Sequence, residues 1–212
     1  MFILEFLYAN TNILIFLLTA LAITFLVVRS SRHSKRIDEI KRRFLEEEEA
    51  ANLVRKKEID PELFYTADLS TLPALPENDT AQVERASKRL MIYFKEPITN
   101  LELKKQYGVM QMDIIAQYEE NFNEYLKALT KWAGSIMADS PDDAIKILEL
   151  VVSLGGEFRD TYRHSADIYA ARGDEAALDA LLRAAGENHF NDPNIRILVC
   201  EYIFKKKEEI QT

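Results

Sequence analysis

The stretch IAQYEENFNEYLKALTKWAGSI, residues 115–136, has the clearest periodicity in the chain. Its large apolar side chains alternate between spacings of three and four residues, at Ile115, Tyr118, Phe122, Tyr125, Leu129, Trp132 and Ile136. That spacing places all of them on one face of an α-helix. Such an aromatic face could be a binding surface, but at helical spacing it more often packs in a core. The stretch therefore predicts a long amphipathic helix in an all-α domain.

Signals for helix ends follow this stretch at regular intervals. Ser140-Pro141 precedes two acidic residues, Gly173-Asp174 lies between two apolar stretches, and Asp192-Pro193 opens the last one. A capping side chain, a proline in the first turn and acidic residues near the N-terminus all favour a helix start. No stretch here alternates apolar and polar residues with period two. We therefore expect helices and no strands in residues 80–212.

Two shorter helices are expected before the long one. Thr99 and Glu102 have the spacing of a capping box, and the helix that they open should end at Gly108. Apolar residues from Val83 to Phe94 share one face and predict an earlier helix, which begins near Asp79 and stops before Pro97.

An internal repeat connects the C-terminal helices. A shift of 33 residues superimposes apolar positions on one another. The equivalent positions are Leu129, Tyr162 and Ile195; Ala133, Ala166 and Val199; Ile136, Tyr169 and Tyr202; and, on the second helix, Ala144 and Ala177, Ile145 and Leu178, Leu148 and Leu181. Each unit is a helix, a tight turn and a second helix, which is typical of a solenoid of helix pairs.

The second of these units resembles the tetratricopeptide repeat. Its first helix carries Ala166 and, three positions on, Tyr169, and a Gly173-Asp174 turn follows. Its second helix has small residues seven apart with a large one between them, at Ala177, Leu181 and Ala184. The resemblance covers residues 125–207 and implies two helix pairs and a capping helix. The repeat is one residue shorter than the usual 34 of that family, and the first unit has Ser140-Pro141 in place of a Gly-Asp turn.

A second resemblance covers most of the chain. Its residues are Leu103 to Gly108, Tyr118, Asn121-Phe122, Leu129 and Lys131-Trp132-Ala133. They are similar to an uncharacterised group of single-span bacterial membrane proteins with helical cytoplasmic domains. This resemblance implies a bacterial origin and no particular activity.

The N-terminal residues 1–28 predict a transmembrane anchor. Every residue from Ile13 to Val28 is apolar or Thr, and a helix of roughly 20 residues crosses the hydrocarbon core of a bilayer. A cleaved signal peptide is the alternative, but it needs a positive N-terminal region, and Met1 to Asn12 contains no Lys or Arg.

A basic flank follows the apolar stretch. It consists of Arg29, Arg32, Lys35, Arg36, Lys41, Arg42 and Arg43. By the positive-inside rule this side stays in the cytoplasm, so the N-terminus faces outward from the cell membrane. The flank could also bind anionic lipids. Residues 44–212 carry 20 Lys and Arg against 32 Asp and Glu, about −12 in charge, which argues against a nucleic-acid partner.

A stalk and a linker are expected between the anchor and the helical domain. Residues 29–57 comprise the basic flank and a charged helix with a short apolar stripe, which favours a solvated stalk. Residues 58–79 contain three prolines and many apolar side chains. This linker should pack in extended form on the domain, although a short docking motif for a partner is an open alternative.

No residues predict a catalytic, cofactor or metal site. The chain has no phosphate-binding glycine loop, and His33, His164 and His189 are isolated from one another. Cys200, the only cysteine, is expected to pack on the apolar face of the last helix. The run Glu46–Glu49 is expected to be a solvated helix face. The sequence therefore predicts no enzyme and no cofactor, and an enzyme stays only a distant third alternative to the two functions below.

Two functions remain from different classes. The first is a membrane-anchored scaffold or adaptor whose helix pairs bind a protein partner. Lys131, Arg163 and Arg196 take nearly equivalent places in successive units and could meet acidic groups, although plain solubility also explains them. The second is a structural or assembly protein that forms homo-oligomers through its stalk or its long helix.

Overall fold

The computed structural model describes residues 11–73, 81–188, 190 and 192–211, with only the backbone at 11–14, 17, 27–28 and 30–34. The chain divides between Val54 and Arg55 into two compact units. In its described residues the C-terminal unit is all-α apart from one pair of short strands. The expectations for Asp79, His189 and residues 1–10 fall outside the described residues.

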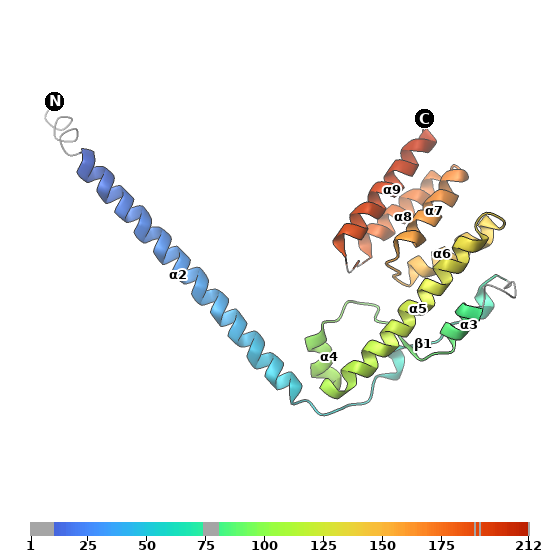
Figure 1. The fold of residues 1–212 in the computed structure, drawn as a ribbon, viewed down its shortest axis with the longest axis horizontal. Coiled ribbons are helices and arrows are strands. Elements are labelled where there is room, and N and C mark those ends of the chain that lie inside the picture. Colours follow the sequence, from blue (N-terminus) through green and yellow to red (C-terminus); the bar gives the residue numbers. More distant parts are fainter. Residues whose placement is uncertain (1–10, 74–80, 189, 191, 212) are drawn as a thin grey trace. The chain divides into compact units, whose positions relative to one another are not determined.

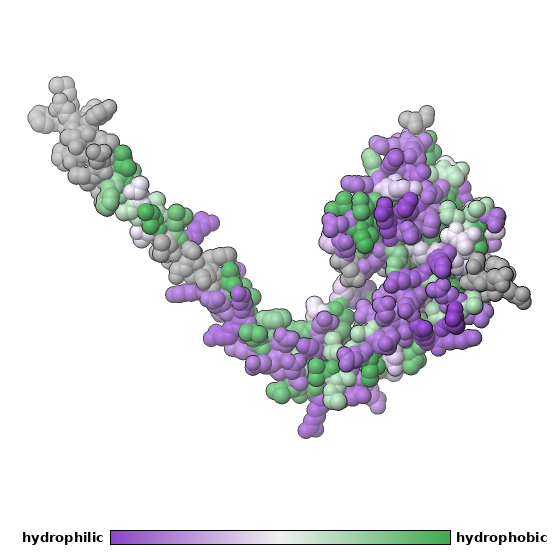
Figure 2. All heavy atoms as spheres, viewed as in Figure 1, coloured by the Kyte–Doolittle hydropathy of each residue, from purple (hydrophilic) through white to green (hydrophobic). Residues whose placement is uncertain are grey.

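A single helix, α2 (Thr11–Asn52), forms nearly all of the described part of the N-terminal unit. It runs without a break through the predicted basic flank and most of the predicted stalk. Thr19 and Thr24 donate their hydroxyl hydrogens to the Phe16 and Ala20 carbonyls, at 2.9 and 2.8 Å. In Figure 2 its early turns are mostly hydrophobic and its later turns carry more hydrophilic residues. In the part of the chain that the structure describes, no helix combines the length and the apolarity needed to cross a membrane.

The C-terminal unit begins with an irregular segment and ends in a stack of helices (Figure 1). Its elements are η1 (Pro61–Leu63), β1 (Phe64–Tyr65), η2 (Leu69–Thr71), α3 (Ala81–Ser87), β2 (Met91–Ile92), α4 (Asn100–Tyr107), η3 (Val109–Gln111), α5 (Met112–Ile136), α6 (Pro141–Ser153), α7 (Arg159–Ala171), α8 (Glu175–Glu187) and α9 (Pro193–Gln211).

The strand pair corrects the expectation of helices alone. β1 and β2 are antiparallel, with Phe64 opposite Ile92 and Tyr65 opposite Met91. The predicted helix to Phe94 instead ends at Ser87. Met91 and Ile92 are fully buried, and a continuous apolar stretch that is buried on both faces suits a strand as well as a helix. Periodicity alone therefore could not exclude the strand.

The described part of the linker, residues 58–73, packs on the helical domain. The expected extended form is corrected, because the 3-10 helices η1 and η2 interrupt the segment and only β1 is a strand. Tyr65, Leu69 and Leu72 lie against the main core. The Tyr65 ring is 5.1 Å from that of Phe122 and 6.1 Å from that of Tyr125, measured between centroids. The segment therefore contributes to the core of the C-terminal unit.

The predicted helix ends are largely confirmed. Thr99 and Glu102 form a complete capping box, and Gly108 ends α4 with a φ of 82°. The Asp174 carboxylate accepts a hydrogen bond from the Ala177 amide and so caps α8. Pro141 occupies the first turn of α6, but the Ser140 side chain makes no capping bond.

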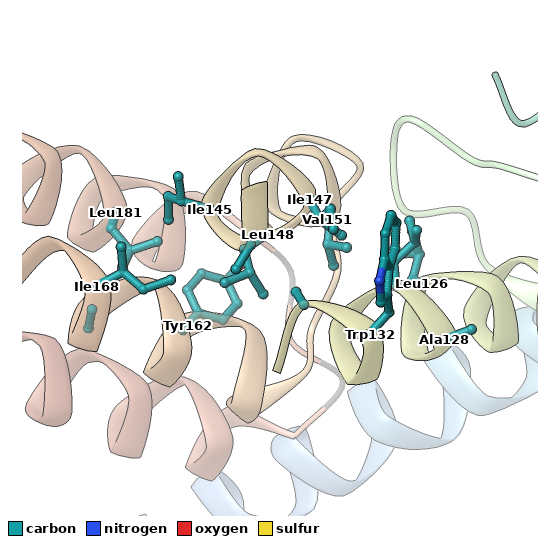
Figure 3. Packing of buried hydrophobic residues seen from close by; sticks show 14 of the residues in the cluster. Leu126, Ala128, Trp132, Ile145, Ile147, Leu148, Val151, Tyr162, Ile168 and Leu181 are labelled. Carbon is teal, nitrogen blue, oxygen red and sulfur yellow. The ribbon is translucent and has the colours of Figure 1, made fainter. Parts of the chain in front are cut away.

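The 33-residue repeat corresponds to a shared core. Leu129 and Tyr162 are fully buried at one repeat position, and Ala133, Ala166 and Val199 are fully buried at the next. Figure 3 shows part of this core, with Trp132 on α5, Leu148 on α6 and Tyr162 on α7. The aromatic face of α5 is thus mostly interior, as predicted, and successive helix pairs pack through equivalent positions.

Candidate functional site

A cleft of about 530 Å³ lies in the C-terminal unit. One wall is α5, which contributes Glu119, Phe122, Asn123 and Leu126 at helical spacing. The other walls are the connection 93–98 after β2, the turn between α6 and α7, and the end of α8 with Phe190. Four segments that are distant in sequence therefore meet in one depression.

Local sequence explains why two of these walls are irregular. Pro97 lies just before the Thr99 cap of α4, and a proline is disfavoured inside a helix, so no helix forms at this point before α4 begins. Gly155 follows α6 with a φ of 75°, a left-handed conformation that glycine adopts without steric cost. The chain can thus reverse direction at the edge of the cleft before α7 begins.

The floor of the cleft is apolar, and its edge also carries several apolar side chains. Ile92, Leu103, Phe122 and Leu126 are buried beneath it. Phe94, Ile98, Leu154 and Phe190 are only half-buried, so parts of their side chains contact solvent. Apolar surface that is gathered in a concave site is typical of ligand-binding and partner-binding surfaces.

The charged lining is mainly acidic. The described residues around the cleft include Glu96, Glu119, Glu157 and Glu187, with Lys95 as a cation. Partial desolvation raises the pKa of Glu119, and the nearby charges of Glu120 and Glu157 raise that pKa further. The charged side chains that line the described part of the cleft are therefore mostly acidic, above an apolar floor.

The basic residues singled out by sequence lie elsewhere. Lys131, on α5, is exposed and lines a smaller cavity of about 220 Å³ together with Gln82, Arg85 and Ser135. Arg196 is exposed on α9. Neither residue lines the larger cleft, and their part in binding stays a prediction.

Arg163 takes part in a contact between α7 and α9. Its guanidinium carbon lies 5.1 Å from the centroid of the Tyr202 ring, and its Nη1 is 3.9 Å from an oxygen of Asp160. The Tyr202 hydroxyl donates to Asp167 at 2.8 Å, and Lys206 is 3.3 Å from the same carboxylate. Arg163 thus has a structural role, and the binding role predicted for it stays a prediction.

The cysteine and one of the histidines, which could have had a chemical role, pack against other parts of the domain. Cys200 is half-buried and packs against the main core, as expected for a packing cysteine. His164 lies beside Gly134 between α7 and α5. Among the described residues, no group of three or more His, Cys, Asp or Glu side chains is placed to hold a metal ion.

Sequence reasoning did not find the larger cleft. Its lining comes from four separate segments, and no short motif connects them. Residues 90–94 were expected to continue a helix, so the wall that follows β2 could not be placed. The one available signal was the pair Glu119-Glu120 beside the apolar face of the long helix.

A comparison of the chain with protein-family models, with curated proteins and with solved structures found no match.

Proposed function

We propose that this protein is a membrane-anchored adaptor whose cytoplasmic helical domain binds a protein partner. The observation that carries the proposal is the cleft beside α5, where half-buried Phe94, Ile98, Leu154 and Phe190 surround a buried apolar floor. Solvent-accessible apolar side chains in a concave site gain free energy when a partner covers them. The shared packing of the 33-residue units supports a tetratricopeptide-like arrangement.

The sequence supports the membrane part of the proposal. Residues 13–28 are apolar or Thr, and the seven Lys and Arg of residues 29–43 outnumber two acidic residues there. These features favour a single span with the helical domain in the cytoplasm. A reporter enzyme that is active only outside the cytoplasm, fused to the C-terminus, tests this orientation. Activity of the fused reporter would contradict a cytoplasmic helical domain.

Site-specific photocrosslinking in cells tests the adaptor role. A photoreactive phenylalanine analogue replaces Phe94 at the cleft in the full chain, and a second version carries it at Phe204, which is 55% exposed on α9. We expect Phe94 to give a discrete crosslinked protein that Phe204 does not give. Equal crosslinking from both positions, or none from Phe94, would contradict binding at the cleft.

Self-association is a second candidate, and exposed apolar residues on α2 favour it. Ile37, Ile40 and Phe44 follow helical spacing and are 38%, 58% and 52% exposed. Two copies of this stripe could pack together, whereas the aromatic face of α5 is mostly buried within its own unit. Light scattering on the full chain in neutral detergent tests this candidate. A monomer, after correction for bound detergent, would rule out self-association under those conditions.

A further inference from the structure

The charge of the cleft narrows the chemistry of the partner. Its described lining combines four Glu residues with one Lys. Charges around a concave surface favour a partner of opposite sign and repel one of the same sign. An acidic segment would add negative charge beside Glu119, whose pKa is already raised by partial desolvation and by the charges of Glu120 and Glu157.

The apolar lining sets a second requirement. A bare cation would leave Phe94, Leu154 and Phe190 in contact with water. A Lys or Arg side chain lays its methylene stem along apolar surface while its charged end reaches acidic groups. Apolar residues next to that side chain would cover the rest of the cleft. The volume of the cleft is about 530 Å³. Pockets that bind small ligands have volumes of about 300–1,000 Å³, so the cleft has room for one or two side chains of a partner.

We infer that the cleft binds a segment of a partner protein in which Lys or Arg has apolar neighbours. This inference rests on the proposed adaptor function and adds the chemistry of the partner. The partner's basic side chain lies near Glu119 and Glu157, and its apolar neighbours contact Phe94 and Leu154. Because Glu119 is exposed to solvent, salt screens its interaction with the partner, and affinity falls as ionic strength rises.

Selection of random short peptides on phage tests the inference. The target is the full chain in a neutral detergent, so that no anionic lipid competes for basic peptides. We expect the enriched peptides to combine Lys or Arg with apolar residues. Their affinity for Glu119→Lys should fall at least about tenfold, which corresponds to about 1.4 kcal/mol.

Matched controls separate a charge effect at the cleft from one elsewhere. Glu201→Lys makes the same change at an exposed position of α9 outside the cleft, and it should leave peptide affinity within about twofold, since distant surface charges are screened. Leu154→Ser removes apolar contact without changing charge. Circular dichroism on each variant shows that the helices are intact.

The outcomes distinguish this inference from the proposed function. Enriched peptides that are neutral or acidic, and that Leu154→Ser weakens, would overturn the basic partner and support an adaptor cleft. Enriched peptides that neither Glu119→Lys nor Leu154→Ser weakens would overturn binding at the cleft itself. A selection that enriches no peptide above an empty-detergent control would count against both.

Discussion

Thr130 on α5 and Thr161 on α7 hydrogen-bond to each other inside the core, with their Oγ1 atoms 2.8 Å apart. Both residues are buried, and Thr130 also donates to the Leu126 carbonyl at 3.0 Å. Thr161 can then be the donor to Thr130. The pair fixes the two helices in register, because a slip would leave the buried Thr161 hydroxyl without this partner.

Thr130→Val should therefore destabilise the domain by about 1–3 kcal/mol, since it leaves the Thr161 hydroxyl buried and unpaired. The double variant with Thr161→Val should cost less than the sum of the two single changes. Urea unfolding, followed by the fluorescence of Trp132, measures both; Trp132 is the sole tryptophan of the chain. Additive costs would show that the two hydroxyls do not interact.

Gly134 lets α5 approach α7 closely at His164. A Cβ atom at Gly134 would lie 3.1 Å from the Nε2 atom of His164, closer than an ordinary van der Waals contact. Alanine in a helix interior is otherwise favoured over glycine by about 1 kcal/mol. We expect Gly134→Ala alone to change stability little, because the strain offsets this gain.

The same substitution should stabilise the domain when His164 is also replaced. In a His164→Ala background the contact is gone, so Gly134→Ala should raise the free energy of unfolding by about 0.5–1 kcal/mol. Thermal unfolding of the parent protein, the two single variants and the double variant measures the difference. If Gly134→Ala changes stability equally with and without His164, then His164 has no role in this contact.

The segment before α3 should be needed for a stable fold. A fragment from residue 78 lacks β1 and Tyr65, which cover Met91 and the rings of Phe122 and Tyr125. Exposing such side chains costs roughly 1.5–3 kcal/mol each. We expect fragment 78–212 to unfold at lower urea than fragment 55–212 and to bind more of a hydrophobic dye. Equal unfolding midpoints would show that the segment contributes nothing.

The parts of the fold that sequence predicted have local causes. The capping box at Thr99 and the Asp174 cap depend on residues a few positions apart. The repeat positions recur at a fixed spacing, so their burial follows from one pattern. The amphipathic face of α5 likewise follows from spacing along one helix.

The parts of the fold that the sequence did not predict depend on contacts between distant segments. Met91 and Ile92 form a strand because Phe64 and Tyr65 pair with them, and no local pattern at residues 90–94 shows that partner. The cleft has the same origin, since Glu119, Leu154 and Phe190 come together only after the helices pack. Arg163 fitted a binding pattern in the sequence, but its contact with Tyr202 depends on the placement of α9.

Buried tyrosines should make the domain unstable at high pH. Burial raises the pKa of Tyr162 to about 12, despite the hydrogen bond that its oxygen accepts from Asn188. The unfolded value is about 10, so the unfolded state loses this proton first, and stability should fall as pH rises from about 10 to 12. Absorbance near the tyrosinate maximum, recorded with circular dichroism, should show some tyrosines ionising only as the helices unfold. Complete ionisation before unfolding would contradict this.

Arg163 and Arg196 should differ in their effect on stability. Both have equivalent places in the repeat, but Arg163 stacks on Tyr202 while Arg196 is exposed. Arg163→Glu removes a cation–π contact worth about 0.5–1 kcal/mol or more, and places a carboxylate near Asp160. It should therefore lower the free energy of unfolding by about 1 kcal/mol, whereas Arg196→Glu should stay within about 0.5 kcal/mol of the parent protein.

Arg163→Lys should recover part of the loss, because a lysine also attracts the ring, though less well than the planar guanidinium. Urea unfolding of the three variants measures these differences, and an equal loss for Arg163→Glu and Arg196→Glu would show that the Tyr202 contact adds no stability.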